Sequence, residues 1–365
     1  MLILLAMTLG GSAPGDDAVK DIDPPQHVIV ITDMTKLMQG DVAASTLSPG
    51  QLMTFTKSNG DWRYTPDFHG WVSFRDVVPL DQAVAYFTKV IKEKPTAAAF
   101  HHRGIAHIAL GEWEEALKDL NAAIQQGDKS TYVFVNRGIA YRETQVPEKA
   151  LQDFTQAIAV DDKNLQAIMY RGMLLLDLGH NEAALKDFDK LIALAPENAE
   201  AYNQKGVVLR VLDKHEESLA AFNKAIELES QYPDAYANRA FELCHKGQFK
   251  EAIADYERAL SLVPDHVEFM NDYAWLLATC REPSVVNGAK AVELAKKACE
   301  LVDNSDPAFL DTLAAAQARA GDYDAAVKTA NKAIELMGSD GAVSEVDKRR
   351  ALYRSRKPFT ETQVQ

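Results

Sequence analysis

One short pattern recurs along most of this 365-residue chain at a fixed interval. It reads GEWEEAL from residue 111, GHNEAAL from 179, GQFKEAI from 247 and GDYDAAV from 321. Its small residue falls at Ala116, Ala150, Ala184, Ser218 and Ala252, which are spaced by 34 residues. A strict period of this length indicates an array of one small structural unit, in which each copy buries its apolar face against its neighbours.

Within each unit, the apolar residues recur at helical spacing and predict two helices. The first helix carries a bulky residue and a small residue four positions later, as in Tyr202 and Gly206. The second carries Ala150, Phe154 and Ala157 or their equivalents, which lie on one helical face. These positions resemble the tetratricopeptide repeat (TPR) family. The resemblance implies an all-α, right-handed superhelix of helical hairpins that binds other proteins.

The period sets the expected boundaries of the repeats. Full repeats are predicted at 97–130, 131–164, 165–198, 199–232 and 233–266. A sixth at 267–306 carries an insertion between its helices, and a seventh spans 307–340. Residues 79–96 read as half a repeat, and 341–365 as a capping helix with a tail.

Residues 28–78 follow a different pattern of short β-rich runs separated by turn residues. Strands are expected at 27–32, 51–58, 61–65 and 70–78. The order of its turn glycines, tryptophans and final valine pair resembles a bacterial SH3-like barrel, which makes the chain a multidomain protein. Trp62, Tyr64 and Trp71 then either line a ligand groove or form the barrel core. The valine pair at 77–78 leads directly into the first helix and predicts a rigid junction.

Three stretches near the C-terminus extend the resemblance to nearly the whole chain. They are NDYAWLLATC from residue 271, NGAKAVELAKKACEL from 287 and DPAFLDTLAAAQARAGDYDAAV from 306. They resemble a family of bacterial TPR proteins that carry an N-terminal SH3-like domain. This resemblance implies the architecture but no particular activity.

The first residues suggest a targeting segment. An apolar run at 2–9 is followed by small residues at 10–13, which resembles the end of a secretory signal peptide, although no basic residue precedes the run. We therefore expect a truncated signal peptide at 1–13, a linker at 14–27 and export to the periplasm or cell envelope. A cytoplasmic protein with a disordered tail is the alternative. No other stretch is apolar enough to predict a membrane helix.

Charge and cysteine content exclude several classes of function. The 39 basic and 53 acidic residues give a formal charge of −14, which disfavours binding to nucleic acid or to anionic lipid. Three cysteines cannot supply a disulfide framework, and Cys244, Cys280 and Cys299 are expected to be free thiols.

In TPR proteins, four positions of each first helix line a concave groove, and the resemblance implies a partner-binding surface there. The matching residues are Ile105, Tyr132, Val135, Ile139, Met169, Met173, Leu176, Asn203, Asn238, Phe241 and Trp275. The N-terminal half of this set is apolar, so it either binds a partner or completes the core between repeats. The Lys, Asn and Arg clamp by which some TPR proteins hold a C-terminal carboxylate is absent.

Acidic residues occupy the second position of three later repeats. They are Glu200, Asp234 and Glu268, with Asp272 and Asp311 nearby. This acidic ladder either receives a basic segment of a partner or only complements the helix dipole.

Nothing in the sequence indicates catalysis. His101, His102 and His107 do not pair at helical spacing, and there is no phosphate loop, nucleophile elbow or paired metal motif. We therefore expect no cofactor, no metal and no enzyme activity. The sequence predicts an adaptor that holds a protein segment in its concave groove. The alternative is a cell-envelope module whose barrel recognises wall peptide or glycan.

Overall fold

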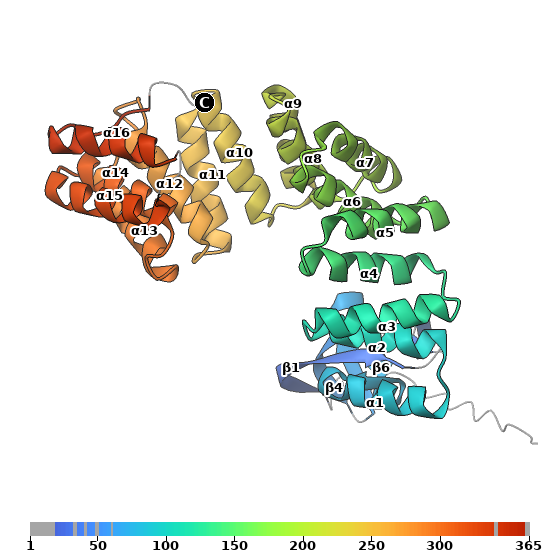
Figure 1. The fold of residues 1–365 in the computed structure, drawn as a ribbon. Coiled ribbons are helices and arrows are strands. Elements are labelled where there is room, and N and C mark those ends of the chain that lie inside the picture. The colour runs from blue at the N-terminus through green and yellow to red at the C-terminus, as the bar shows by residue number, and fades with distance from the viewer. Residues whose placement is uncertain are drawn as a thin grey trace, which may run out of the picture. The chain divides into compact units, whose positions relative to one another are not determined.

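The computed structural model describes residues 19–31, 35–39, 42–47, 51–59, 61–338 and 342–361 (Figure 1). The predicted signal peptide at 1–13 lies outside these residues. The chain divides into two compact units, residues 1–174 and 175–365, which are taken in turn below.

The N-terminal unit begins with an antiparallel sheet of seven strands in the order β3-β2-β6-β5-β4-β1-β7. The strands are β1 Lys20–Val30, β2 Thr35–Gln39, β3 Val42–Leu47, β4 Leu52–Asn59, β5 Trp62–Thr65, β6 Gly70–Ser73 and β7 Val77–Pro79. Two of them, β2 and β3, were not predicted, because the stretch from 35 to 47 is rich in Ala, Ser and Thr and lacks a clear apolar alternation.

Two sequence expectations for this region are corrected by the structure. Residues 20–27 belong to β1, so the linker predicted at 14–27 was wrong there. Among the described strands no ladder joins β3 to β7, so the sheet is open and the predicted barrel is not closed. The physical reason lies in β7, which is only three residues long and leaves the sheet at once as helix α1 (Leu80–Glu93).

The core of the sheet is mainly aliphatic. Val28, Val30, Leu37, Met53, Phe55 and Val72 are among its buried side chains. Trp62, Tyr64 and Trp71 are only half-buried, and Tyr64 lies directly across from Trp71 in the β5–β6 ladder. Since Val72 points into the core, its neighbour Trp71 lies on the opposite face of the sheet. The three aromatic residues therefore do not form the core.

The sheet and the first helices share a second apolar cluster. Ile29 and Val78 from β1 and β7 pack with Ala83 and Phe87 of α1 and with Ala106 of helix α2 (Ala97–Ala109). The junction after the valine pair is therefore packed from strand to helix, with no intervening linker.

Sixteen helices are described after the sheet. The N-terminal unit holds α1 Leu80–Glu93, α2 Ala97–Ala109, α3 Trp113–Gln125, α4 Thr131–Glu143 and α5 Pro147–Val160, and the division falls within α6 Leu165–Asp177. The C-terminal unit holds α7 Asn181–Leu194, α8 Ala199–Val211, α9 His215–Leu228, α10 Pro233–His245, α11 Phe249–Leu262, α12 Val267–Thr279, α13 Gly288–Leu301, α14 Pro307–Arg319, α15 Tyr323–Met337 and α16 Ala342–Arg354. In the described part of the chain, no helix has both the length and the hydropathy needed to cross a bilayer.

The turn between the two helices has the same backbone conformation in the five full repeats from 97 to 266. Gly111, Gln145, Gly179, Asp213 and Gly247 all have positive φ, between 58° and 75°, and they recur every 34 residues. Glycine adopts this conformation without strain, which explains why glycine begins the repeated sequence pattern. Two repeats use glutamine or aspartate instead.

Small residues in the first helices allow close packing, as the sequence predicted. A Cβ atom built on Gly138 would lie 2.6 Å from the ring of Phe154, and one on Gly206 would lie 2.5 Å from the ring of Phe222. Both phenylalanines are fully buried. The pattern of a glycine in the first helix and an aromatic residue in the second is thus a direct steric match.

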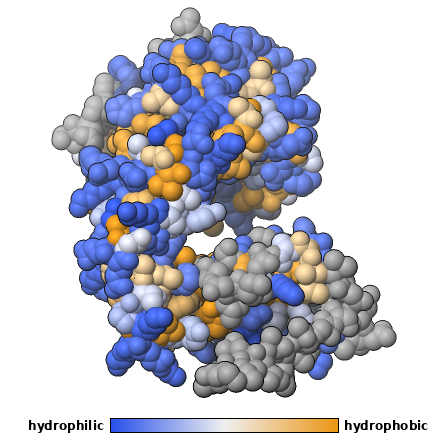
Figure 2. All heavy atoms as spheres, turned by 90° about the vertical axis from the view of Figure 1, so that its right-hand side faces the viewer, coloured by the Kyte–Doolittle hydropathy of each residue, from blue (hydrophilic) through white to orange (hydrophobic). Residues whose placement is uncertain are grey.

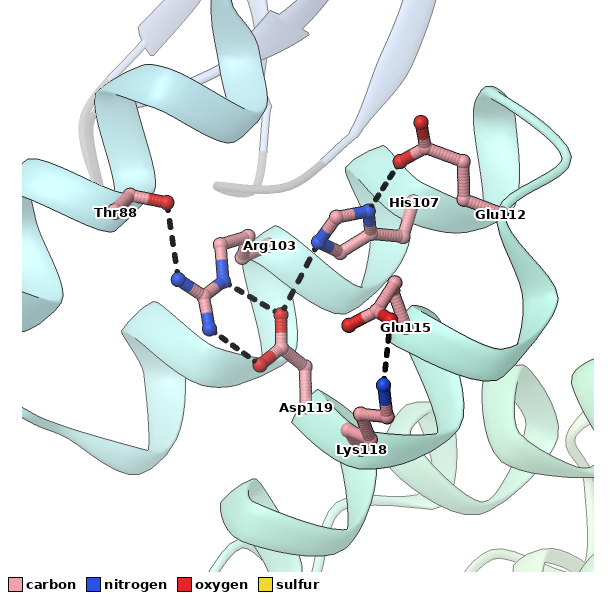
Figure 3. A network of polar contacts seen from close by, with 7 residues as sticks. All are labelled: Thr88, Arg103, His107, Glu112, Glu115, Lys118 and Asp119. Atoms are coloured by element: carbon pink, nitrogen blue, oxygen red, sulfur yellow. Dashed lines mark hydrogen bonds and ion pairs between the residues drawn. The ribbon is translucent and has the colours of Figure 1, made fainter.

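A charged pair joins the two helices of several repeats. Arg103 donates to both carboxylate oxygens of Asp119 at 2.7 Å, and it also reaches Thr88 of the preceding helix (Figure 3). Arg137 with Asp153 and Arg239 with Asp255 repeat this bidentate geometry. Such planar pairs fix the register of the hairpin.

The histidines of the N-terminal unit have separate partners. His107 Nδ1 lies 2.6 Å from Glu112 Oε2 (Figure 3), whereas His101 contacts Asp128 and accepts from Asn136. The described residues contain no group of three or more His, Cys, Asp or Glu suited to a metal ion.

The fourth full repeat replaces the charged pair with a different polar cluster. Ser218 stands where other repeats have alanine, and its single hydroxyl proton is shared between the carbonyl of Gly206 at 2.8 Å and Oε1 of Glu242 at 3.2 Å. Glu242 is fully buried and also contacts Nδ1 of His215 at 2.9 Å. The departure of Ser218 from the sequence pattern therefore satisfies a buried carboxylate.

Candidate functional site

The predicted apolar groove residues of the N-terminal unit differ widely in exposure. Tyr132 is 60% exposed, whereas Val135 is fully buried and Met169 is 9% exposed. Ile105, Ile139 and Met173 are half-buried, as is Leu176 at the start of the C-terminal unit. Val135 and Met169 therefore belong to the packing between helices rather than to an open surface. On the face shown in Figure 2, apolar residues form small groups separated by hydrophilic ones.

In the C-terminal unit, the predicted residues gather around two adjoining depressions. The larger one, called the acidic hollow below, has a volume of about 490 Å³. It is lined by Arg210 of α8, by Asp234, Ala237, Asn238 and Phe241 of α10, and by His266, Glu268, Phe269 and Asp272 at α12. Three of the five acidic residues named from the sequence, Asp234, Glu268 and Asp272, therefore line one hollow.

The smaller depression, called the aromatic cavity below, has a volume of about 150 Å³. It is lined by Phe241 and Cys244 of α10, Phe249 and Tyr256 of α11, Asp272, Trp275, Leu276, Cys280 and Arg281 at α12, and Glu361. Phe241 and Asp272 line both depressions, so the two share a wall.

Two lining residues of the hollow, Arg210 and Asn238, belong to a chain of hydrogen bonds that continues to Asn203. Arg210 donates to Oδ1 of Asn238 at 3.2 Å, and Asn238 donates to Oδ1 of Asn203 at 3.1 Å. The Arg210 guanidinium also stands 5.0 Å from the ring centre of Phe241, and burial lowers its pKa.

Arg210 was missed by the sequence analysis, although a signal for it was present. It is the twelfth residue of the repeat at 199–232, one of the four positions that line the groove in TPR proteins. The same rule that selected Asn203 would have selected Arg210.

Asp272 is the most perturbed carboxylate of the site. Asp272 is exposed by surface area, yet many protein atoms lie around its carboxylate in the wall that the two depressions share, and this partial desolvation raises its pKa to about 6. Within the described residues no lysine or arginine forms an ion pair with it, and the Asn271 side chain is its hydrogen-bond donor. Glu268 contacts His266 at 3.2 Å, and Asp234 is exposed.

The other acidic residues of the predicted ladder lie elsewhere. Burial, together with the charges of Glu200 and Asp234, raises the pKa of Tyr232, but Glu200 does not line the hollow. Asp311 also has a raised pKa through burial, but Arg349 donates to both of its oxygens at 3.2 and 2.6 Å. Asp311 is thus a structural ion-pair residue.

Trp275 contacts the chain's own C-terminal segment, here residues 355–361. Its Nε1 donates to Oε2 of Glu361 at 3.3 Å, and its ring lies 5.9 Å from that of Phe359. The backbone of Glu361 donates to the carbonyl of Thr279, and Arg319 donates to the carbonyl of Phe359 at 2.6 Å. This return of the segment to α12 and α14 was not predicted, because it depends on contacts 40 to 86 residues apart.

All three cysteines are free thiols. Burial raises the pKa of Cys244 to about 12 and that of Cys299 to about 11, and it also raises the pKa of Cys280. Such thiols are protonated at neutral pH and behave as small apolar side chains rather than nucleophiles.

Comparison with protein-family models confirms the predicted repeats. Tetratricopeptide repeat models match residues 80–131 and 171–235, and another matches residues 233–266. These matched segments are therefore tetratricopeptide repeats, a class of helical hairpin that serves protein interaction. No curated protein matches the chain in sequence.

One solved structure shares the fold over most of this chain, and two others are similar to about half of it. A tetratricopeptide repeat protein from Parabacteroides merdae ATCC 43184 is 17% identical with a TM-score of 0.51, over 73% of this chain and 98% of its own. YrrB, described as a TPR protein with an unusual peptide-binding site, is 22% identical over 52% of this chain and 98% of its own, with a TM-score of 0.44. MamA from Desulfovibrio magneticus RS-1, from residue 41 to its end, is 21% identical over 46% of this chain and 95% of its own, with a TM-score of 0.43. At these identities the likeness concerns the fold alone.

Proposed function

We propose that this protein is a non-catalytic interaction module that binds a basic segment of a partner protein in the acidic hollow of its C-terminal unit. Tetratricopeptide repeats supply the class of function, and the hollow supplies the chemistry of the partner. Asp234, Glu268 and Asp272 face one depression, and Arg210 is the single arginine or lysine among its lining residues. The half-buried ring of Phe241 offers apolar surface beside these charges.

Asp272 is the observation that carries the proposal. A carboxylate that loses hydration without gaining an ion pair is less stable in its charged form, as its raised pKa reflects. Structural carboxylates of this chain, such as Asp119 and Asp311, are instead paired with arginine. A cation from a partner would provide the missing charge, and perturbed carboxylates of this kind concentrate at functional sites.

The hollow suits the side chain of lysine or arginine in particular. Their methylene stems can lie against the half-buried ring of Phe241 while the charged end reaches the carboxylates. Asn238 and the Phe241 ring fix the position of the Arg210 guanidinium at the hollow. Its positive charge opposes the entry of many further cations. We therefore expect a segment with one or two basic residues rather than a long polybasic run.

A library of short random peptides tests this proposal with the full-length chain. Retained peptides should be enriched in lysine and arginine, and the Asp234→Asn/Glu268→Gln/Asp272→Asn variant should lose this enrichment. The matched control Glu251→Gln/Asp324→Asn/Glu335→Gln alters the same total charge at exposed positions outside the hollow and should retain it. Equal enrichment by all three proteins would contradict the proposal.

A second candidate function rests on the outer face of the sheet. Trp62, Tyr64 and Trp71 are half-buried there, and the Tyr64 and Trp71 rings meet edge-to-face at 5.5 Å. Partly exposed aromatic surfaces of this kind bind sugars and peptides, so the β region would act as an SH3-like module that recognises cell-wall peptide or glycan after export. Retention of the full chain on purified cell wall, lost on Trp71→Ala, would favour this candidate. Equal retention of both forms would exclude the aromatic face.

A further inference from the structure

We propose that the aromatic cavity receives an aromatic side chain of the same basic segment, next in the chain to the residue whose cation enters the acidic hollow. This inference rests on the proposed function and specifies the partner further. The partner would carry a basic residue directly beside a phenylalanine or a residue of similar shape.

The size and lining of the cavity select the aromatic ring. Apolar cavities of about 150 Å³ accept a molecule the size of benzene, and this one has that volume. Phe241, Phe249, Tyr256 and Trp275 supply four of its walls, and aromatic rings pack well against one another edge to face. The Cys244 and Cys280 thiols add apolar surface, because burial keeps them protonated.

The position of the charges explains why a basic residue should be the neighbour. The carboxylates of Asp272 and Glu361 both line the cavity, and Arg281 is its one lysine or arginine. Asp272 and Phe241 continue into the acidic hollow, which holds two further carboxylates. Together the lining residues of the two depressions include four acidic residues against two arginines, which is complementary to a cation. Two depressions with a shared wall suit two side chains of one short segment.

The C-terminal segment completes the cavity. Glu361 is fixed by the Thr279 carbonyl and by Trp275 Nε1, while Phe359 and Arg349 stand 5.9 and 5.4 Å from the Trp275 ring. One wall of the cavity therefore comes from the far end of the chain, and it holds Trp275 in the orientation that lines the cavity.

Three synthetic peptides test the inference by calorimetry on the full-length protein: acetyl-Gly-Lys-Phe-Lys-Gly-amide, the same peptide with Ala for Phe, and the Phe peptide with Glu for both Lys. Burial of one phenyl ring should make the Lys-Phe peptide bind about tenfold or more tightly than the Lys-Ala peptide. The Glu peptide should bind more weakly than either.

The variant Cys244→Phe provides the matched protein control, because its ring would fill the cavity from α10 and leave the hollow unchanged. We expect it to bind the Lys-Ala peptide as the native chain does and to lose the preference for phenylalanine. Equal binding of the Phe and Ala peptides by the native chain, or a preference kept by Cys244→Phe, would overturn the inference and leave the acidic hollow intact. No advantage of the lysine peptides over the Glu peptide would overturn the proposed function, and this inference with it.

Discussion

Among single residues, Asp272 makes the most direct connection between the site and stability. Its pKa is about 6 in the folded chain against an ordinary value of 3.8, so the folded state holds its proton more tightly than the unfolded state. Between about pH 4 and pH 6, the free energy of unfolding therefore falls as the pH rises. At pH 7 Asp272 is charged in the folded chain, and the desolvation of this charge lowers the free energy of unfolding.

The variant Asp272→Asn removes this cost. Because the side chain retains contact with solvent, we expect a gain of only about 1 kcal/mol in the free energy of unfolding at pH 7.5. The gain should vanish below about pH 4, where aspartic acid is neutral in both states. Urea unfolding at the two pH values measures this, with Asp324→Asn, whose side chain is 94% exposed, as the control. A loss of stability at pH 7.5 would show that the carboxylate makes stabilising contacts instead.

Gly206 tests the steric match that defines each hairpin. The variant Gly206→Ala would place a methyl group 2.5 Å from a ring atom of the fully buried Phe222. We expect a loss of about 1–3 kcal/mol in the free energy of unfolding, because the ring has no room to move. The double variant with Phe222→Leu should lose less than the sum of the two single changes, and strict additivity of the two changes would contradict the match.

At the scale of helices and turns, the residue with positive φ between paired helices lowers the conformational stability of two repeats, where it is not glycine. Glycine adopts positive φ freely, whereas Gln145 and Asp213 do so at a cost of about 1 kcal/mol. We expect Gln145→Gly to raise the free energy of unfolding by about 0.5 kcal/mol, once the greater freedom of glycine in the unfolded chain is subtracted.

The reciprocal change supplies the comparison. An alanine at Gly179 would meet no atom within 4 Å, so any loss must come from the backbone alone. Gly179→Ala should lower the free energy of unfolding by about 1 kcal/mol, as measured by urea unfolding. A neutral result in both variants would mean that the turn relaxes to another conformation.

The elements differed in how far the sequence determined them. The helices were predictable because the motif residues contact partners within the same 34-residue unit, as Gly206 and Phe222 do. The strands β2 and β3 were missed, since a run such as Val42–Leu47 has no alternation and gains its order from pairing with β2. Closure of the sheet would require pairing of the edge strands β3 and β7, which are distant in sequence. The three residues of β7 are too few to form that ladder.

For the whole molecule, the class of function followed from the repeats, whereas the site required the folded chain. Asn238, Phe241 and Asp272 were predicted singly, but only the structure brings them together with Arg210 around one hollow. The contact of Trp275 with Glu361 spans 86 residues and has no sequence signal. The exposed groove expected in the N-terminal half included Val135, whose complete burial follows from packing between helices.

The affinity of the full-length chain for the acetyl-Gly-Lys-Phe-Lys-Gly-amide peptide tests the central claim most directly. Calorimetry should show that neutralising Asp234, Glu268 and Asp272 together weakens binding by about tenfold or more, because each close charge pair contributes up to about 1 kcal/mol. The control variant with three neutralised exposed acids, Glu251→Gln/Asp324→Asn/Glu335→Gln, should bind within about twofold of the native chain. Unchanged affinity in the first variant, or an equal loss in both, would show that the acidic hollow is not where this protein holds a basic partner.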